Sequence, residues 1–73
     1  MVLSNVNSGE RIKIIAILDS NIKSQAIRLG IFEGVELICL DTLHNGPIIM
    51  KNRMQEVAIG RKLADQIEIM KVV

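Results

Sequence analysis

The chain has 73 residues and a formal net charge of +1, with nine basic side chains against eight acidic ones. This length allows one small domain, over residues 1–73, and the even charge balance argues against a surface for nucleic acid or an anionic membrane. Hydrophobic residues make up 49% of the chain and include 13 isoleucines, which excludes intrinsic disorder, while the single aromatic residue argues against base stacking.

The cysteine content and the N-terminal sequence favour a cytoplasmic location. One cysteine cannot form an internal disulfide, and the first residues do not have the pattern of a signal peptide. The longest unbroken apolar run, residues 14–18, is far too short to cross a bilayer. We therefore expect a cytoplasmic protein that is not itself embedded in a membrane.

The N-terminal part of the chain predicts a turn and then a strand. Leu3 and Val6 are three residues apart, so both can lie on one side of a turn. Residues 10–18 first alternate charged and apolar side chains and then become wholly apolar. This pattern is typical of a strand that begins half exposed and ends buried.

A helix is expected next, with a polar cap at its start and a glycine at its end. Asp19 or Ser20 can accept hydrogen bonds from the N–H groups of the first turn. Gly30 can adopt the left-handed conformation that ends a helix, and Ile31 can pack back on the last turn. The apolar positions that share one helical stripe are Ile22, Ala26 and Leu29.

The second half of the chain predicts four short strands separated by turns. Asn45-Gly46 is the strongest hairpin dipeptide in the sequence. Pro47 suits the first residue of a strand, because no ladder N–H is needed there. The strands are expected at residues 35–40, 48–51, 54–59 and 67–72, with connectors at residues 32–34, 41–46 and 52–53.

Together these elements predict an all-β fold, a small barrel of five antiparallel strands. One helix is inserted between strands 1 and 2, and a short helical turn over residues 61–65 precedes strand 5. A barrel suits a small chain, because closure removes unpaired sheet edges. In the last strand we expect Ile67 and Ile69 to face inward and Glu68 and Lys71 to stay exposed.

Few side chains in the sequence can carry chemistry. Cys39 and His44 are the candidate ligands for a divalent transition metal such as Fe²⁺ or Zn²⁺, whereas a structural zinc site needs about four nitrogen or sulfur ligands. The alternatives are a buried cysteine beside a loop histidine, or ligands shared between chains. No paired carboxylates or nucleophile with a matched base are evident, so we expect neither an enzyme nor a required cofactor.

Two apolar residues depart from the expected core pattern. On a helical wheel Ile27 points away from the apolar stripe, and Phe32 lies in the connector between Gly30 and Gly34. Isolated exposed apolar residues are common, and either side chain can instead lie under the N-terminal segment. Two such residues near one helix end can also form a patch for a partner. Both interpretations stay open at this point.

Segments along nearly the whole chain carry a resemblance to one family. They are Met1-Val2-Leu3-Ser4 with Val6 and Gly9-Glu10, the strand residues Ile12, Ile14 and Ile17, the corner Leu29-Gly30-Ile31 with Gly34, the pair Gly46-Pro47, and the closing Val57-Ala58-Ile59-Gly60-Arg61 with Ala64, Ile67 and Ile69. In this order they resemble the FeoA family of small ferrous-iron-transport accessory proteins. One departure is Gln25-Ala26, where family members often carry Arg-Leu, so the role of an arginine there does not transfer to this chain.

The resemblance implies an SH3-like barrel and a partner in ferrous iron uptake. That partner is a FeoB-like membrane transporter, whose cytoplasmic G-protein domain would recruit the chain to the inner face of the membrane. The chain would then act as a non-enzymatic protein-interaction module. Its candidate partner-binding residues are Ile27, Arg28, Gly30, Phe32 and Gly34.

Two further roles follow from the same resemblance. A GTPase-activating role would need an arginine at the γ-phosphate, and Arg28, Arg53 and Arg61 are the candidates. The alternative function is a transition-metal-binding regulatory domain like the SH3-like C-terminal domain of iron-dependent repressors, although we expect a stand-alone domain here. Apolar residues on both faces of residues 35–40 leave a homo-oligomer open.

Overall fold

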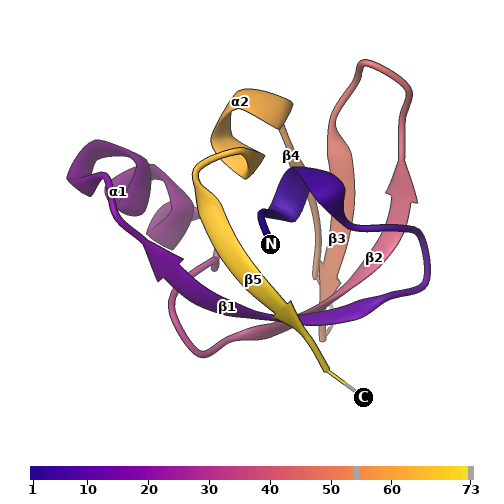
Figure 1. The fold of residues 1–73 in the computed structure, drawn as a ribbon, viewed down its shortest axis with the longest axis horizontal. Coiled ribbons are helices and arrows are strands. Elements are labelled where there is room, and N and C mark those ends of the chain that lie inside the picture. The colour runs from indigo at the N-terminus through magenta and orange to yellow at the C-terminus, as the bar shows by residue number, and fades with distance from the viewer. Residues whose placement is uncertain (54, 73) are drawn as a thin grey trace.

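The computed structural model describes residues 1–53 and 55–72, so Met54, expected in the fourth strand, lies outside the described residues. Within these ranges the chain forms five strands, two α-helices and one short 3₁₀ helix (Figure 1). In chain order the elements are η1 (Leu3–Asn5), β1 (Arg11–Ile17), α1 (Ser20–Arg28), β2 (Glu36–Thr42), β3 (Ile48–Asn52), β4 (Gln55–Ile59), α2 (Arg61–Ala64) and β5 (Ile67–Lys71).

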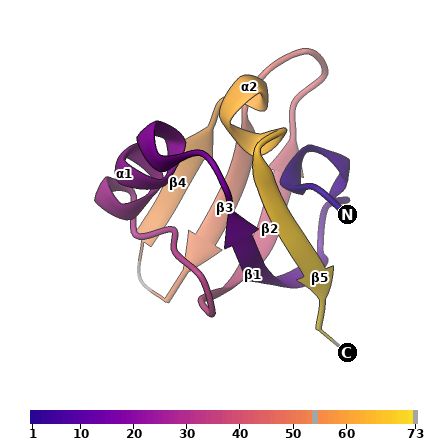
Figure 2. The same ribbon diagram turned by 60° about the vertical axis from the view of Figure 1, so that its left-hand side comes forward.

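The five strands form one antiparallel sheet in the order β4-β3-β2-β1-β5. The sheet is strongly bent, and α2 connects its two outer strands, β4 and β5, across one end (Figures 1 and 2). Helix α1 is inserted between β1 and β2 and lies to one side of the sheet. This arrangement confirms the predicted five-stranded barrel, including the positions of both helical segments in the chain.

A β-bulge in β1 places one isoleucine of its apolar run in solvent. Pairing with β5 shifts by one residue between Ile14 and Ala16, and Ile15 between them is 46% exposed. Ile14 and Ile17 are buried on either side of the bulge. The prediction that this strand ends fully buried is therefore wrong for Ile15. It is also wrong for Leu18, which is 88% exposed because it follows the last paired residue.

Asp19 caps the N-terminus of helix α1, and its Oδ1 accepts hydrogen bonds from the N–H groups of Asn21 at 2.8 Å and Ile22 at 3.0 Å. Ala26 is fully buried and Ile22 packs against the core, as the helical stripe predicts. The prediction is wrong for Leu29, which is exposed because it lies at the C-cap, after the last helical residue.

No helix in the described ranges has the length and apolar character that a membrane crossing needs.

Strand β2 starts one residue later than expected and continues to Thr42, into the predicted loop. Its last two paired residues lie opposite the start of β3, which shortens the connection between the two strands. The hairpin expected at Asn45-Gly46 is confirmed, with Asn45 at a positive φ of 56°. The N–H of Gly46 donates to the carbonyl of Leu43 at 3.0 Å and closes the turn.

The N-terminal segment covers the outer edge of β5. The carbonyl of Met1 accepts a hydrogen bond from the N–H of Ile69 at 2.7 Å, and Val2 forms a bridge with Glu68. Leu3 is fully buried below this contact, and Val6 is buried with it, as their spacing predicts. The segment therefore pairs with an edge that would otherwise be open.

The core is apolar and receives side chains from every strand. Ile67 and Ile69 face inward and Glu68 and Lys71 are exposed, as predicted. Ile31, in the connector after α1, is also fully buried in this core. The largest side chains that are fully buried are Leu3, Ile12, Ile14, Ile31, Leu37, Cys39, Ile48, Met50, Ile59 and Ile67.

Candidate partner-binding surface

A tight C-terminal cap ends α1. The N–H of Ile31 donates to the carbonyl of Ala26 at 2.9 Å, and the N–H of Gly30 donates to the carbonyl of Ile27 at 3.0 Å. These bonds form a Schellman motif with Gly30 in the left-handed region at φ 79°. Ile31 and Ala26 are both buried, so the cap is anchored to the core, as the sequence predicts.

Three apolar side chains around this cap point into solvent, and we call Ile27, Leu29 and Phe32 the α1 corner. Their exposed fractions are 54%, 39% and 48%. Ile27 and Phe32 are thus exposed, not buried under the N-terminal segment. The apolar stripe of the helix predicts a buried Leu29, and only the structure places it with these exposed residues. A cluster of this kind on an anchored cap is a candidate for contact with a partner.

Charged groups border the α1 corner. Arg28 is exposed in the last turn of α1. Nζ of Lys23 lies 3.4 Å from Oε1 of Glu33, which connects the helix to the connector before β2. Apolar surface with a charged rim is the usual composition of a protein interface.

Gly34 fixes the path of the chain from the corner into β2. Its φ is 93°, and its N–H donates to the carbonyl of Ile14 at 2.8 Å. The N–H of Ile14 in turn donates to the carbonyl of Val35 at 2.9 Å. The connector is therefore tied to the middle of β1, and Gly34 lies where the α1 corner meets a groove.

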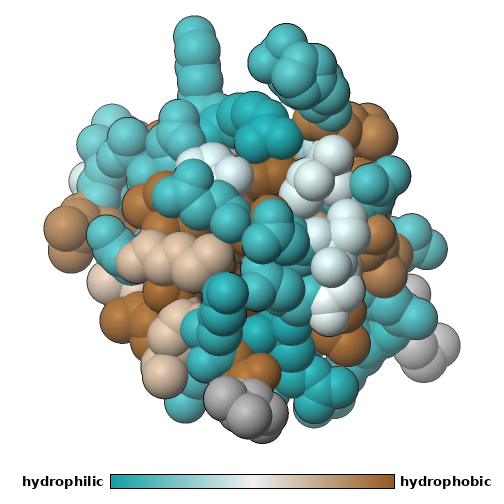
Figure 3. All heavy atoms as spheres, turned by 45° about the vertical axis from the view of Figure 1, so that its right-hand side comes forward, coloured by the Kyte–Doolittle hydropathy of each residue, from teal (hydrophilic) through white to brown (hydrophobic). Residues whose placement is uncertain are grey.

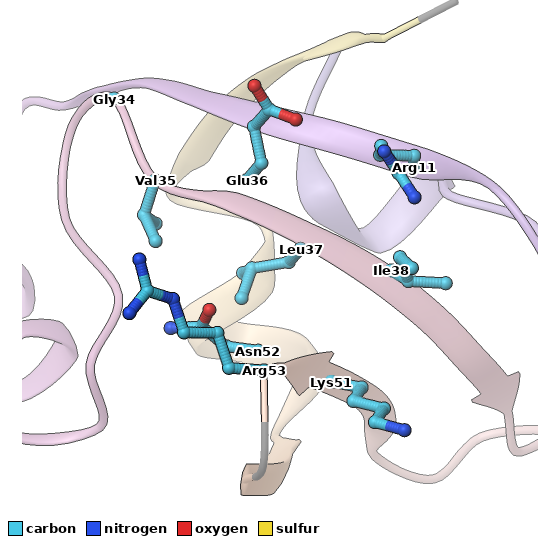
Figure 4. Close-up of a pocket in the computed structure, with 9 residues that line it drawn as sticks. All are labelled: Arg11, Gly34, Val35, Glu36, Leu37, Ile38, Lys51, Asn52 and Arg53. Atoms are coloured by element: carbon cyan, nitrogen blue, oxygen red, sulfur yellow. The ribbon is translucent and has the colours of Figure 1, made fainter.

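This groove has a volume of about 420 Å³, and we call it the β2–β3 groove. Figure 4 shows that its lining comes from β1, the first half of β2, and the end of β3 with the turn after it, and that the guanidinium of Arg53 extends towards Val35. No pattern in the sequence predicts the groove, because its walls lie on three separate segments. The lining residues are Arg11, Gly34, Val35, Glu36, Leu37, Ile38, Lys51, Asn52 and Arg53.

The groove opens where the pairing between β2 and β3 stops. The last pair of that ladder is Ile38 with Lys51. Asn52 pairs with Gln55 of β4 on the other edge of β3 but with no residue of β2, and Arg53 enters the turn with a positive φ of 54°. The first residues of β2 therefore have no β3 neighbour beside them.

The α1 corner and the groove are adjacent. Gly34 lines the groove and lies two residues after Phe32. On the other side, a Cβ placed on Gly30 would lie 4.0 Å from Oε1 of Gln55, in the same hairpin that carries Arg53. An apolar corner and a groove with three cationic side chains thus form neighbouring parts of one surface.

Apolar residues are also exposed outside this surface. Figure 3 shows hydrophilic residues through the centre of one face, with hydrophobic surface on both sides of them. Leu18, just before the start of α1, is 88% exposed, and Met70, in β5, is 50% exposed. Exposure alone therefore does not mark a binding site, and such residues provide controls.

The structure places the two candidate metal ligands in different environments. Cys39 faces the core from β2 and is buried, and burial raises the pKa of its thiol. His44 is exposed in the β2–β3 hairpin. Within residues 1–53 and 55–72, no group of three or more His, Cys, Asp or Glu side chains is arranged to hold a metal ion. Metal binding by this pair stays a prediction.

The three candidate arginines differ in their surroundings. Arg28 and Arg53 are exposed. Arg61 is half-buried, and its guanidinium donates to the carbonyls of Leu43 at 2.9 Å and Ser4 at 3.3 Å. Arg61 therefore connects the N-terminal segment and the β2–β3 hairpin to α2.

The fold is shared with several solved structures. The crystal structure of an iron uptake regulatory protein (FeoA) matches with a TM-score of 0.91 and 26% identity, covering 99% of this chain and 97% of that chain. A FeoA-like protein from Clostridium acetobutylicum matches with a TM-score of 0.88 and 19% identity, covering 100% and 87%. ScaR with bound Zn²⁺ matches with a TM-score of 0.87 and 15% identity, covering 99% of this chain but 37% of ScaR. These neighbours confirm the SH3-like barrel.

The sequence itself identifies the family. Among curated proteins, none matches this chain. A family model described as the FeoA domain, in contrast, matches residues 1–71, which is almost the full length. The chain therefore belongs to the FeoA family, which is tied to ferrous iron transport.

Proposed function

We propose that this chain is an accessory module of ferrous iron uptake that docks on the cytoplasmic G-protein domain of a FeoB-like membrane transporter. The match of the FeoA domain over residues 1–71 carries the proposal. In this role the chain acts from the cytoplasm and is held at the inner face of the membrane by its partner. It binds and carries out no reaction of its own.

The α1 corner is the surface that we assign to docking. Ile27, Leu29 and Phe32 are already exposed and stand on a cap that the Schellman bonds hold in place, so little ordering is needed on binding. Burying apolar side chains of this size releases about 25 cal/mol for each Å² removed from water. Aromatic residues at the centre of an interface often dominate its binding energy, which favours Phe32 as the main contact.

The test compares binding of variants to the purified cytoplasmic domain of a FeoB-like transporter. Ile27→Ser and Phe32→Ser should each weaken binding by about tenfold, the effect of roughly 1.4 kcal/mol. Leu18→Ser is the matched control, because Leu18 is more exposed but lies at the other end of α1. It should leave the affinity unchanged.

Thermal unfolding of the same variants separates docking from folding. Both corner variants should keep the wild-type melting temperature within a few degrees, because their side chains are half exposed. A large loss of stability would show that these residues belong to the core. Equal binding by all three variants and the wild type would exclude the α1 corner as the docking surface.

The alternative function, a metal-binding regulatory domain, is tested by metal titration. If Cys39 and His44 hold a divalent metal, as the regulatory-domain hypothesis requires, anaerobic titration with Fe²⁺ or Zn²⁺ should saturate at micromolar metal. Cys39→Ser and His44→Ala should each abolish that binding. The buried position of Cys39 favours docking as the primary function, since only a thiolate is a good metal ligand.

A further inference from the structure

We propose that the β2–β3 groove binds an extended acidic peptide segment, which adds one short strand beside the start of β2. This site is separate from the α1 corner, and the proposal does not depend on the identity of the partner docked there. Three properties of the groove support it: its charge, an open position in its backbone pairing, and its partly exposed apolar wall.

The charge of the groove suits an acidic ligand. Arg11, Lys51 and Arg53 line it, against the single carboxylate of Glu36. In the described part of the chain, none of these three cations has a carboxylate within ion-pair distance. Their positive charges are therefore available to a ligand, and carboxylates are the matching groups on a peptide.

The backbone of β2 offers hydrogen bonds to the same ligand. Cys39 and Val35 both bond to β1, since the N–H of Cys39 donates to the Glu10 carbonyl and the Val35 carbonyl accepts from Ile14. Alternate residues of an antiparallel strand turn their N–H and C=O groups to opposite sides. The N–H and C=O of Glu36 therefore face the groove, where the β3 ladder has already ended.

The side chains of the groove wall favour a peptide over a small anion. Val35 and Ile38 are only partly covered, so they can receive apolar side chains of a bound strand. In Figure 4 the Glu36 side chain points away from the side of β2 on which Val35 and Leu37 lie, so its carboxylate leaves the backbone groups accessible. A phosphate could use the cations alone, whereas an extended peptide can use all three features.

The experiment measures fluorescence anisotropy of a labelled peptide of alternating valine and glutamate, titrated with the intact chain. A peptide of alternating valine and lysine tests charge, and the acidic peptide with prolines in place of its valines tests the backbone hydrogen bonds. We expect saturable binding of the acidic peptide only. Binding should slow amide hydrogen exchange at Glu36, a readout that charge attraction alone would not produce.

Neutralising variants locate the site. Arg53→Asn removes the charge and keeps a residue that tolerates the positive φ at this position, and combined with Lys51→Gln it should weaken binding by about tenfold. Lys62→Gln removes one exposed charge from α2 as the control and should have no effect. Equal weakening by Lys62→Gln, unchanged binding in the double variant, or displacement of the peptide by equimolar inorganic phosphate would overturn the proposal.

Discussion

Glu10 connects two ends of the chain through its two carboxylate oxygens. Oε2 lies 2.7 Å from Nζ of Lys71 at the end of β5, and Oε1 accepts from the N–H of Asn7 at 2.7 Å. The hydrogen bond from Lys71 and then that from Asn7 hold the pKa of this carboxyl below its ordinary value of 4.5. The ionised form of Glu10 is therefore the one that the folded chain favours.

This lowered pKa predicts a pH dependence of stability. A carboxyl with a lowered folded-state pKa stabilises the fold above about pH 4.5, and that contribution is lost as the pH falls through the folded-state pKa. Glu10→Gln should therefore melt below the wild type at neutral pH, and the difference should shrink as the pH falls below 4.5. Melting temperatures of both proteins across this range check it, and a difference independent of pH would contradict it.

The backbone of Gly30 allows a second prediction at a single residue. Gly30→Ala should destabilise the fold by about 1–2 kcal/mol, because a Cβ in the left-handed region costs that much for most residues. Gly30→Asn is the control, since asparagine tolerates this conformation and should cost less. The nearest contact of an added Cβ is 4.0 Å away, so steric overlap does not confuse the comparison. Equal midpoints of urea unfolding for both variants would argue against backbone strain.

At the scale of elements, Arg61 connects three segments through its side chain: α2, the N-terminal segment and the β2–β3 hairpin. Its guanidinium bonds to the carbonyls of Ser4 and Leu43 from the first residue of α2. Arg61→Ala should lower the free energy of unfolding by about 1–3 kcal/mol, the usual effect of losing hydrogen bonds to a charged group. Lys62→Ala, its exposed neighbour, should change it by less than about 0.5 kcal/mol. Similar free energies of unfolding for the two variants in chemical denaturation would show that the hydrogen bonds of Arg61 contribute little to stability.

Periodicity predicts most of the elements but not where pairing is interrupted. The strand and helix positions follow from local alternation and from turn residues such as Gly30 and Asn45-Gly46. The exposure of Ile15 depends on a bulge against β5, which lies more than fifty residues away in the chain. The β2–β3 groove likewise depends on where the β3 ladder ends. Such features are set by the partner strand, so a pattern within one segment cannot reveal them.

At the scale of the whole molecule, stability depends on a small isoleucine-rich core. A domain of this size has only about 3–5 kcal/mol of stability from its core. Ile14 is 1% exposed at the centre of that core, so Ile14→Ala should cost about 2–5 kcal/mol and leave the chain partly or wholly unfolded at room temperature. Ile14→Val, which leaves a smaller cavity, should cost about 0.5–1.5 kcal/mol and stay folded. Circular dichroism and urea unfolding distinguish the two variants. A folded Ile14→Ala protein with the wild-type midpoint of urea unfolding would show that Ile14 contributes little to the stability of the core.

The rigid core also explains how a chain of 73 residues can present a defined surface. Ile31 and Ala26 anchor the cap of α1, and the hydrogen bonds of Gly34 and Val35 with Ile14 anchor the start of β2. The α1 corner and the β2–β3 groove are thus held at neighbouring positions along one connector. Binding at either should leave the backbone nearly unchanged.

Amide hydrogen exchange on the chain, alone and with the cytoplasmic domain of a FeoB-like transporter, tests the docking of the α1 corner most directly. We predict that exchange slows at residues 27–34, while β5 and the segment around Leu18 exchange as in the free chain. Protection confined to β5 or the N-terminal segment, with residues 27–34 unchanged, would contradict docking at the α1 corner.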